Sequence, residues 1–258
     1  MYTLATLYAL RQHIGLDASD TTEDERLLDA LQAASAAIER RTRRTFQPRV
    51  ASIAHDVNLR DVSELLLKED LLELQSISNG DDSSIDTSDV IQVADAVLRL
   101  TNGAVFTYDE TPVSAITITG IWGYHPDWQN AWEDSGDSVQ DASLSASATS
   151  ITVTDADAGN SPRFQVGQLI RLEDEYLHIT AIDTATNILT VERGVQGTTA
   201  ATHASSTTID IYQMPADVSQ LTLRWALWLY REPDSFSFKL PAILQESLDG
   251  LRRFSVLS

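Results

Sequence analysis

Cysteine is absent from this 258-residue chain, and lysine occurs only twice, at Lys68 and Lys239. Without cysteine the chain has no disulfide framework, no thiolate metal site and no cysteine nucleophile. Long apolar runs are also missing: the longest near the C-terminal end, LTLRWALWLY, is interrupted by Arg224. The first residues lack the basic-then-apolar order of an export signal. We therefore expect a soluble protein with no membrane span and no secretion signal.

Basic residues are few: 18 Lys and Arg stand against 38 Asp and Glu, for a formal net charge of -20. Binding of nucleic acid depends on clustered cations that release counterions from the phosphates, so this chain is expected to repel DNA rather than hold it. The acid excess has three interpretations, which are plain solubility, the wall of a channel that repels DNA, and adaptation to high salt. Composition alone does not choose among them.

Two amphipathic helices are predicted in the first fifty residues. In YTLATLYALRQHIGL, apolar residues recur at three- and four-residue steps until Gly15, which is the pattern of a short helix. After the polar segment DASDTTEDE, a longer helix has the same spacing and acids in its first turn. The apolar positions are Leu4, Leu7, Leu10 and Ile14 in the first helix, and Leu27, Leu31, Ala34 and Ile38 in the second.

Four arginines, Arg40, Arg41, Arg43 and Arg44, lie at the end of the second helix. The helix dipole favours cations at this end, which explains the cluster without any ligand. Two other interpretations stay open: a binding role toward nucleic acid, and salt bridges between subunits.

Patterns typical of strands replace the helical period from Phe46 to about Tyr124. The strongest turns between these runs are Asn79-Gly80 and Asn102-Gly103, because both dipeptides tolerate positive φ. An antiparallel sheet is predicted here, with the acid-rich DDSSIDTSD as an exposed loop and VIQVADAVLRL as either helix or strand.

The remaining chain is predicted to hold a linker, a second β region and two helices. A stretch rich in Ser, Asp and Ala between Asp127 and Ser150 has the composition of a linker, and four or five short strands follow it. Helical periodicity returns after Pro215, with Trp225 and Trp228 on a wide apolar stripe, and again after Pro241.

The predicted fold class is therefore α+β: a helical main domain with an antiparallel sheet, and an inserted small all-β domain that is a barrel or a sandwich. Terminal helices on both sides of a self-contained β region indicate an insertion, because insertion is tolerated where two chain ends lie close at a surface. We expect residues 1-138 and 214-258 to form the main domain, and residues 139-213 the inserted one.

No motif of a catalytic or metal site is complete in this chain. ITVTDADAGN resembles the start of a calcium loop, but Asn160 and Val166 occupy the positions that require glycine and glutamate. The acids Glu173 to Glu175 fall at a predicted hairpin tip, and no HExxH, GxSxG, P-loop or GxGxxG pattern occurs. We expect a protein that is not an enzyme, with no catalytic residue, no cofactor and no metal. Its histidines lack the spacing of metal ligands: His13, His55, His125, His178 and His203.

One stretch, VERGVQGTTAATHASS, does collect residue types found in active sites: Arg193, Thr198, Thr199 and His203. It also has the composition of a turn, since Gly197 permits a tight bend and the hydroxyl groups can satisfy backbone groups of the loop. We interpret the stretch as a fold signature rather than a catalytic constellation.

The N-terminal region resembles the head-tail connector (adaptor) family of tailed phages. The resemblance covers YTLATLYALRQHIGL and DERLLDALQAASAAIERRTRRTF, and is carried by a Leu-patterned helix, an acidic loop and a helix end with a defined set of residues. Two further phrases, residues Ile116 to Pro126 and Glu192 to Ala204, are similar to stretches in structural proteins of tailed viruses. The matching residues of the helix end are Ala33, Ala34, Ile38, Glu39, Arg44 and Phe46.

The resemblance implies a virion protein at the head-tail junction, assembled in the host cytoplasm. Such adaptors form homo-oligomeric rings, commonly of twelve subunits, that dock beneath the portal protein and extend the DNA channel toward a tail or stopper (neck) protein. Double-stranded DNA then passes through without specific binding. By the same analogy Arg252, Arg253, Phe254 and Leu257 face the portal. For the subunit interface we expect the arginines Arg40, Arg41, Arg43 and Arg44, because they can form salt bridges between subunits, and the tryptophans Trp225 and Trp228, because they lie on an amphipathic helix.

The alternative function is a carbohydrate-binding or hydrolytic protein of a virion or cell surface, with the second β region as its binding module. A convergent set of aromatic side chains in that region would favour this alternative. The region contains only Phe164, Tyr176 and Tyr212.

Overall fold

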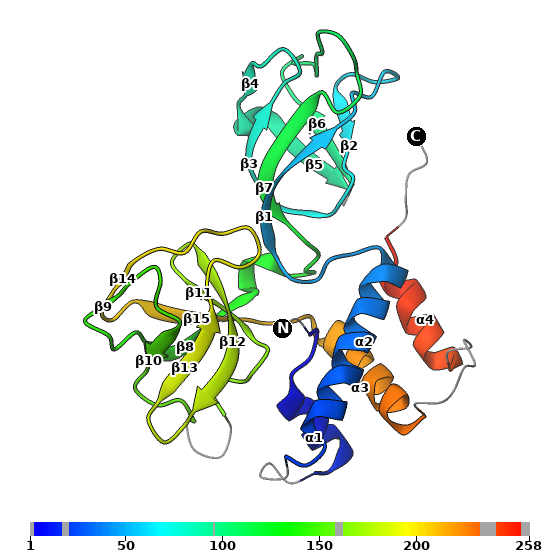
Figure 1. Cartoon of the computed structure of the whole chain (residues 1–258). Helices are drawn as coiled ribbons and strands as arrows, with labels where there is room; N and C mark the ends of the chain where they lie inside the picture. Colours follow the sequence, from blue (N-terminus) through cyan, green and yellow to red (C-terminus); the bar gives the residue numbers. More distant parts are fainter. Residues whose placement is uncertain (1–2, 17–20, 95, 158–161, 233–240, 254–258) are drawn as a thin grey trace. The chain divides into compact units, whose positions relative to one another are not determined.

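The computed structural model describes residues 3–16, 21–94, 96–157, 162–232 and 241–253, and the chain divides into two compact units (Figure 1). Unit 1 comprises Met1–Arg43 and Pro126–Arg252, and unit 2 comprises Arg44–His125 and Arg253–Ser258. Unit 1 contains the helices and a set of strands between residues 132 and 212, which we call the β block. Unit 2 contains the remaining strands.

The helices of unit 1 are α1 (Leu7–Ile14), α2 (Asp24–Thr42), α3 (Ala216–Arg231) and α4 (Ala242–Leu251). The Thr6 hydroxyl accepts a hydrogen bond from the Ala9 N–H at the start of α1, and Gly15 ends the helix in the left-handed conformation. Helix α2 contacts the other three helices, and its predicted apolar stripe is fully buried. Burial of that stripe, rather than intrinsic propensity, is the main source of stability for a helix of this length.

The β block consists of antiparallel strands around one hydrophobic core. Six strands form a sheet in the order β10-β13-β12-β11-β15-β8, and β14 pairs with β9 in a separate ladder. Both sheets line a core that includes Leu144, Ile151, Phe164 and Leu189. The strand bounds are β8 Trp132–Ser138, β9 Ser143–Leu144, β10 Ser150–Thr152, β11 Leu169–Leu172, β12 Glu175–Asp183, β13 Ile188–Glu192, β14 His203–Ala204 and β15 Thr208–Tyr212.

Unit 2 has two sheets and a core of its own. One sheet has the order β1-β7-β3-β4, and the other has the order β2-β6-β5. Trp122 is fully buried in this core, and its indole N–H donates to the Ala51 carbonyl at 2.9 Å. The strand bounds are β1 Arg49–His55, β2 Glu64–Leu66, β3 Leu71–Ser78, β4 Ser84–Ile85, β5 Val90–Ala94, β6 Val97–Leu100 and β7 Ile116–Trp122.

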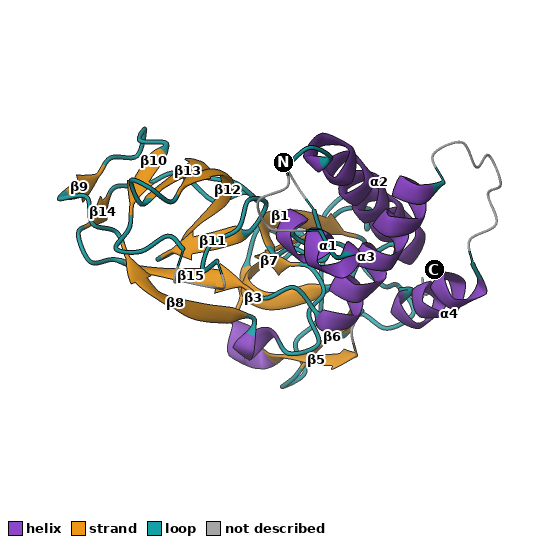
Figure 2. Ribbon diagram, turned by 90° about the horizontal axis from the view of Figure 1, so that it is seen from below, coloured by secondary structure: helices purple, strands orange, loops and turns teal. Residues whose placement is uncertain are grey.

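The predicted fold class is wrong, because most of the regular structure in the described residues is strand, and the chain has no helical main domain among them (Figure 2). Residues 44–125 form two sheets with their own core instead of one sheet attached to helices. The predicted linker contains β8 and β9. The reason is that β8 lies at the edge of its sheet and exposes much of its length, so its sequence WEDSGDS lacks apolar alternation.

The chain enters and leaves the β block at neighbouring residues. The Gln213 N–H donates to the Ala131 carbonyl at 2.8 Å, just outside β15 and β8. Such close ends are what an insertion requires. The prediction that residues 139–213 form an inserted domain stays a prediction, tested below by excision. Among the described helices, none has the length and apolarity for a membrane crossing.

Candidate functional sites

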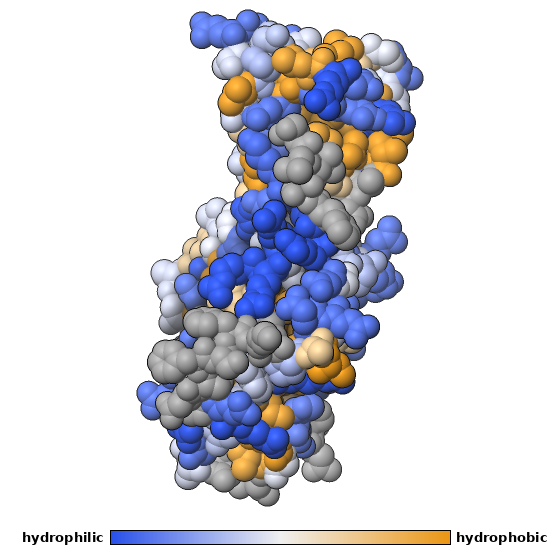
Figure 3. All heavy atoms as spheres, turned by 90° about the vertical axis from the view of Figure 1, so that its right-hand side faces the viewer, coloured by the Kyte–Doolittle hydropathy of each residue, from blue (hydrophilic) through white to orange (hydrophobic). Residues whose placement is uncertain are grey.

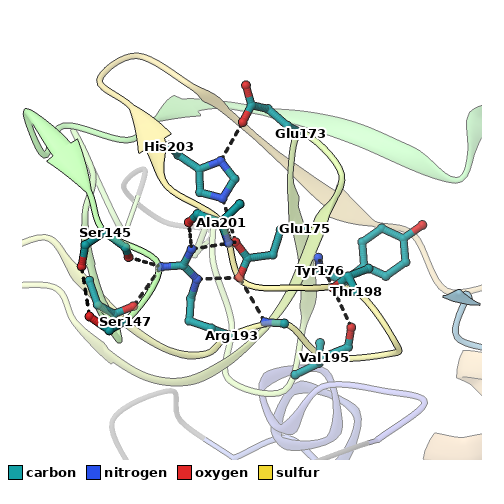
Figure 4. A network of polar contacts seen from close by, with 12 residues as sticks. Ser145, Ser147, Glu173, Glu175, Tyr176, Arg193, Val195, Thr198, Ala201 and His203 are labelled. Atoms are coloured by element: carbon teal, nitrogen blue, oxygen red, sulfur yellow. Dashed lines mark hydrogen bonds and ion pairs between the residues drawn. The ribbon is translucent and has the colours of Figure 1, made fainter.

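The stretch ERGVQGTTAATHA folds around a buried carboxylate, that of Glu175 at the start of β12 (Figure 4). Only 1% of this side chain is exposed. Arg193 donates to it twice, from Nε to Oε1 and from Nη2 to Oε2, each at 2.6 Å. The backbone N–H groups of Gly194 and Ala201 add one bond each at 3.0 Å, and His203 Nε2 lies 2.7 Å from Oε2. Five hydrogen bonds therefore converge on one carboxylate.

These hydrogen bonds determine the ionisation of Glu175. Burial by itself raises the pKa of a carboxyl group, but the bonds from Arg193, Ala201 and His203 outweigh burial and lower the pKa of Glu175 to about 2. The pair is a buried, bidentate ion pair, since 6% of the Arg193 side chain is exposed. Glu175 is therefore ionised at any pH near neutrality.

Arg193 also fastens the segments around the carboxylate. Its Nη1 donates to the carbonyls of Ser145 and Ala148 at 2.9 Å each, and its Nη2 donates to that of Ala201 at 2.7 Å. The guanidinium thus joins the loop that follows β13 to the segment between β9 and β10. A planar group with five donors suits this position, whereas a lysine could not reach so many acceptors.

The other residues of the stretch have structural contacts as well. The Thr198 hydroxyl accepts from the Tyr176 N–H at 3.0 Å and donates to the Val195 carbonyl at 2.8 Å. Gly194 has φ of 61°, and a Cβ there would lie 2.9 Å from the Ala200 nitrogen. Thr199 is exposed. The structure thus brings Arg193, Thr198 and His203 together as the fold signature that the sequence predicts.

Glu175 is the central residue of this network, and sequence analysis misses it. The triplet Glu173 to Glu175 has the composition of an exposed hairpin tip, and 65% of the Glu173 side chain is indeed exposed. Glu173 Oε2 lies 2.8 Å from His203 Nδ1, so the imidazole sits between an exposed and a buried carboxylate. No signal in the sequence marks Glu175, because its burial depends on Arg193, whose own burial is known only from the structure.

The histidines elsewhere are not assembled into a metal site. Burial lowers the pKa of His55 to about 4, and it lowers the pKa of His178 to about 4 as well. His55 stacks on Trp122 with 5.5 Å between ring centroids, and its Nδ1 lies 3.0 Å from the Ile53 carbonyl oxygen. Within the described ranges, no group of three potential metal ligands occurs.

An aromatic cluster in the β block bears on the carbohydrate alternative. Trp132 lies 5.1 Å from Tyr176 and 5.3 Å from Tyr212 between ring centroids, and the Arg171 guanidinium covers its ring at 4.6 Å. Only 3% of Tyr176 and 6% of Tyr212 is exposed. A sugar platform presents open ring faces, so this cluster has the character of core packing.

The arginines at the end of α2 lie on its surface. Arg40, Arg41 and Arg43 are exposed, and the Arg41 guanidinium lies 5.4 Å above the ring of Trp225. Within the described part of the chain, no acid forms an ion pair with Arg40 or Arg43. Trp225 is buried and Trp228 is half-buried, on α3. The structure thus places Trp225 in packing among the helices, and the subunit-interface role of these residues stays a prediction.

Arg44 and Arg253 meet at a buried aspartate of unit 2 that the sequence does not single out. Arg44 lies 3.4 Å from Asp70 and 3.8 Å above the ring of Tyr124, while Arg253 donates to Asp70 at 3.0 Å and to the Leu67 carbonyl at 2.8 Å. The Asp70 side chain thus binds arginines from two distant segments. Of the residues predicted to face a portal, Arg252 is exposed, Arg253 has these contacts within unit 2, and Phe254 and Leu257 lie outside the described residues.

Comparison with known proteins gives a distant likeness among solved structures. No family model matches the chain, and no curated protein matches it. Among solved structures, a chain described as "Neck of empty GTA particle computed with C6 symmetry" is similar, with a TM-score of 0.44 and 12% identity over 97% of this chain and 90% of that chain. At this score and identity we draw no function from the likeness.

Proposed function

We propose that this chain is a structural protein of a tailed-virus particle: a head-tail adaptor that forms a ring beneath the portal protein and extends the DNA channel toward a tail or stopper protein. The observation that carries the proposal is the adaptor-like phrase on α2. Its matching residues have defined structural roles, since Ala34, Ile38 and Phe46 are fully buried and Arg44 stacks on Tyr124.

The use of the Glu175 network supports a structural role over a catalytic one. Both carboxylate oxygens of Glu175 accept bonds that hold a loop, and Thr198 has its hydroxyl committed to backbone partners. Activation of a nucleophile requires a base in hydrogen-bond reach of a group open to substrate. The arrangement around Glu175 serves folding instead.

The charge distribution supports passage of DNA without binding. With a net charge of -20, a ring of such subunits repels phosphate on average. The exposed arginines on the helices are then available for contacts with acidic protein surfaces, including those of neighbouring subunits.

The test is assembly. Purified protein, alone and mixed with the portal protein of the same particle, is examined by mass photometry and negative-stain electron microscopy. We expect rings, with a mass about twelve times that of the 28.4 kDa chain. Labelling of purified particles with an antibody to this chain is expected at the neck. A chain that stays monomeric in both mixtures and is absent from the neck would overturn the proposal.

A further inference from the structure

Exposed apolar side chains are concentrated in unit 2. Of the eight large hydrophobic side chains exposed among the described residues, seven lie between residues 59 and 113, and the eighth is Ile243 on α4. Figure 3 shows hydrophobic atoms gathered in the upper part of the view, over unit 2. Scattered apolar residues are normal on a surface, but a group of them marks an interaction site.

The sheet β2-β6-β5 has apolar residues on both faces, and its outer face also carries the Glu64–Arg99 ion pair, with Arg99 opposite Ile91. An antiparallel sheet that covers a core normally has polar residues on its outer face. On the outer face here, Val97 pairs with Leu66, both half-buried, and Ile91 and Val93 are 47% and 45% exposed. We call Leu66, Ile91, Val93 and Val97 the apolar sheet face. The inner face packs into the core through Leu65, Leu98 and Leu100.

The charges beside this face select the kind of partner. The segment 81–89, which leads directly into β5, carries four aspartates, and none of them ion-pairs with a base in the described part of the chain. Strand β5 is also an open edge of its sheet. Acids beside an open edge disfavour pairing with an identical edge, because the same acids would meet, and they favour a basic partner. The aspartates are Asp81, Asp82, Asp86 and Asp89.

The chain itself supplies unpaired bases for such a contact. In the β block, each arginine is paired with an acid, and in unit 2 Arg60 is the one base of the described residues without an acidic partner. The other exposed bases that have no ion pair among the described residues all lie on the helices or at their C-terminal ends. They are Arg40, Arg41, Arg43, Arg224, Arg231 and Arg252.

We propose that the apolar sheet face and the aspartates beside it bind a second copy of this chain, through the exposed arginines at the C-terminal end of α2 in that copy, Arg40, Arg41 and Arg43. The two surfaces differ, so the contact is heterologous, and repetition of a heterologous contact closes a ring when the rotation permits. The inference rests on the proposed ring, and it names the surfaces that meet. The apolar residues exclude water from the contact, while the charges set its direction.

Three full-length variants test the contact by sedimentation velocity in about 0.15 M salt. The first, I91S/V93S, polarises the apolar sheet face and is expected to weaken association on the order of 100-fold. The second, D86K/D89K, and the third, R40D/R43D, reverse charges on the two surfaces, and each is expected to weaken association about tenfold. Asp is chosen at Arg43 because that residue has φ of 56°, a conformation that Asp tolerates.

A mixture distinguishes direct contact from misfolding. In a mixed ring of D86K/D89K and R40D/R43D, every interface again joins opposite charges, so an equimolar mixture is expected to assemble like the unaltered protein. The matched control E133K/D174K makes the same change of charge at exposed acids of the β block and is expected to leave association unchanged.

The outcomes separate this inference from the proposed function. The inference is overturned if I91S/V93S forms rings as well as the unaltered protein does. It is also overturned if the mixture fails to assemble although each variant is folded by circular dichroism. Neither result contradicts the proposed ring itself. If the unaltered chain forms no ring, alone or with the portal protein, both the inference and the proposed function are wrong. A chain whose apolar sheet face is protected from hydrogen exchange only by the portal protein, and not by other copies, also overturns the inference.

Discussion

Glu175→Gln is the perturbation that best tests the buried network of the β block. Glutamine keeps the shape of the side chain but removes the charge that faces Arg193, and its amide group places N–H donors where a second acceptor oxygen stood. The buried guanidinium then lacks its counterion. Loss of one partner from a buried ion pair costs about 3 to 5 kcal/mol.

The pH dependence gives an independent magnitude for the same interaction. The pKa of Glu175 falls from its ordinary value of 4.5 to about 2 on folding. At about 1.4 kcal/mol for each pKa unit, ionised Glu175 contributes about 3 kcal/mol to stability. Because the folded-state pKa is the lower one, this contribution is complete above about pH 4.5 and is lost as the pH falls toward 2. The variant should lack this part of the acid dependence.

Hydrogen exchange followed by mass spectrometry is the direct assay, since it reports the opening of residues 193–204 separately from unit 2. At neutral pH we expect exchange of that segment in Glu175→Gln to be at least about 100-fold faster, in line with about 3 kcal/mol. Asp174→Asn, an exposed neighbour with the same charge change, is the control and should exchange normally. Unchanged protection in Glu175→Gln would refute the assignment of Glu175 as the centre of the loop.

Three further predictions follow from the fold and the charge. Unit 2 should lose stability between about pH 6.5 and 4, because burial lowers the pKa of His55 and the unfolded state takes up the proton first; His55→Phe, which keeps the stacking on Trp122, should flatten this part of a melting-temperature profile. Excision of residues 132–212, which joins Ala131 to Gln213, should leave helices that are folded by circular dichroism. Excision of residues 139–213 instead leaves β8 without its partner strand β15. Unfolding of both products would contradict the insertion. A series from about 0.1 to 3 M KCl should raise stability throughout if the acids reflect adaptation to salt, and should plateau once screening saturates if they line a channel.

Sequence patterns predicted the elements with strong periodicity. Helix α2 could be predicted because its apolar residues all lie on one buried face. The strands β12 and β13 could be predicted because both are interior strands of their sheet with apolar faces. Unit 2 was assigned to the wrong architecture for a different reason. Local patterns identify strands, but which sheet a strand joins depends on pairing between distant residues, such as Ile53 with Ile118.

Buried polar residues were the second limit of the sequence. Asp70 and Glu175 are acids in an acid-rich chain, so nothing in their neighbourhood marks them as buried. Their burial follows from arginines at distant positions, Arg253 and Arg193, and the sequence gives no distance between such pairs. The apolar sheet face was missed because VIQVADAVLRL fits a helix or a strand. Which of its side chains face outward is known only once the pairing of β5 and β6 with each other and with β2 is known.

The contrast between arginine and lysine connects the fold with the proposed assembly. In the β block, arginines such as Arg193 and Arg171 contact their acids through two nitrogen atoms, a geometry that lysine cannot reproduce. Ion pairing within the chain therefore explains these arginines, whereas Arg40 and Arg43 have no ion pair within the described chain and gain only from the helix dipole. If they meet acids of another copy by charge alone, lysine should replace them in ring assembly. If they form forked pairs there, Arg40→Lys and Arg43→Lys should weaken the ring while Arg60→Lys, the unpaired base of unit 2, leaves it intact.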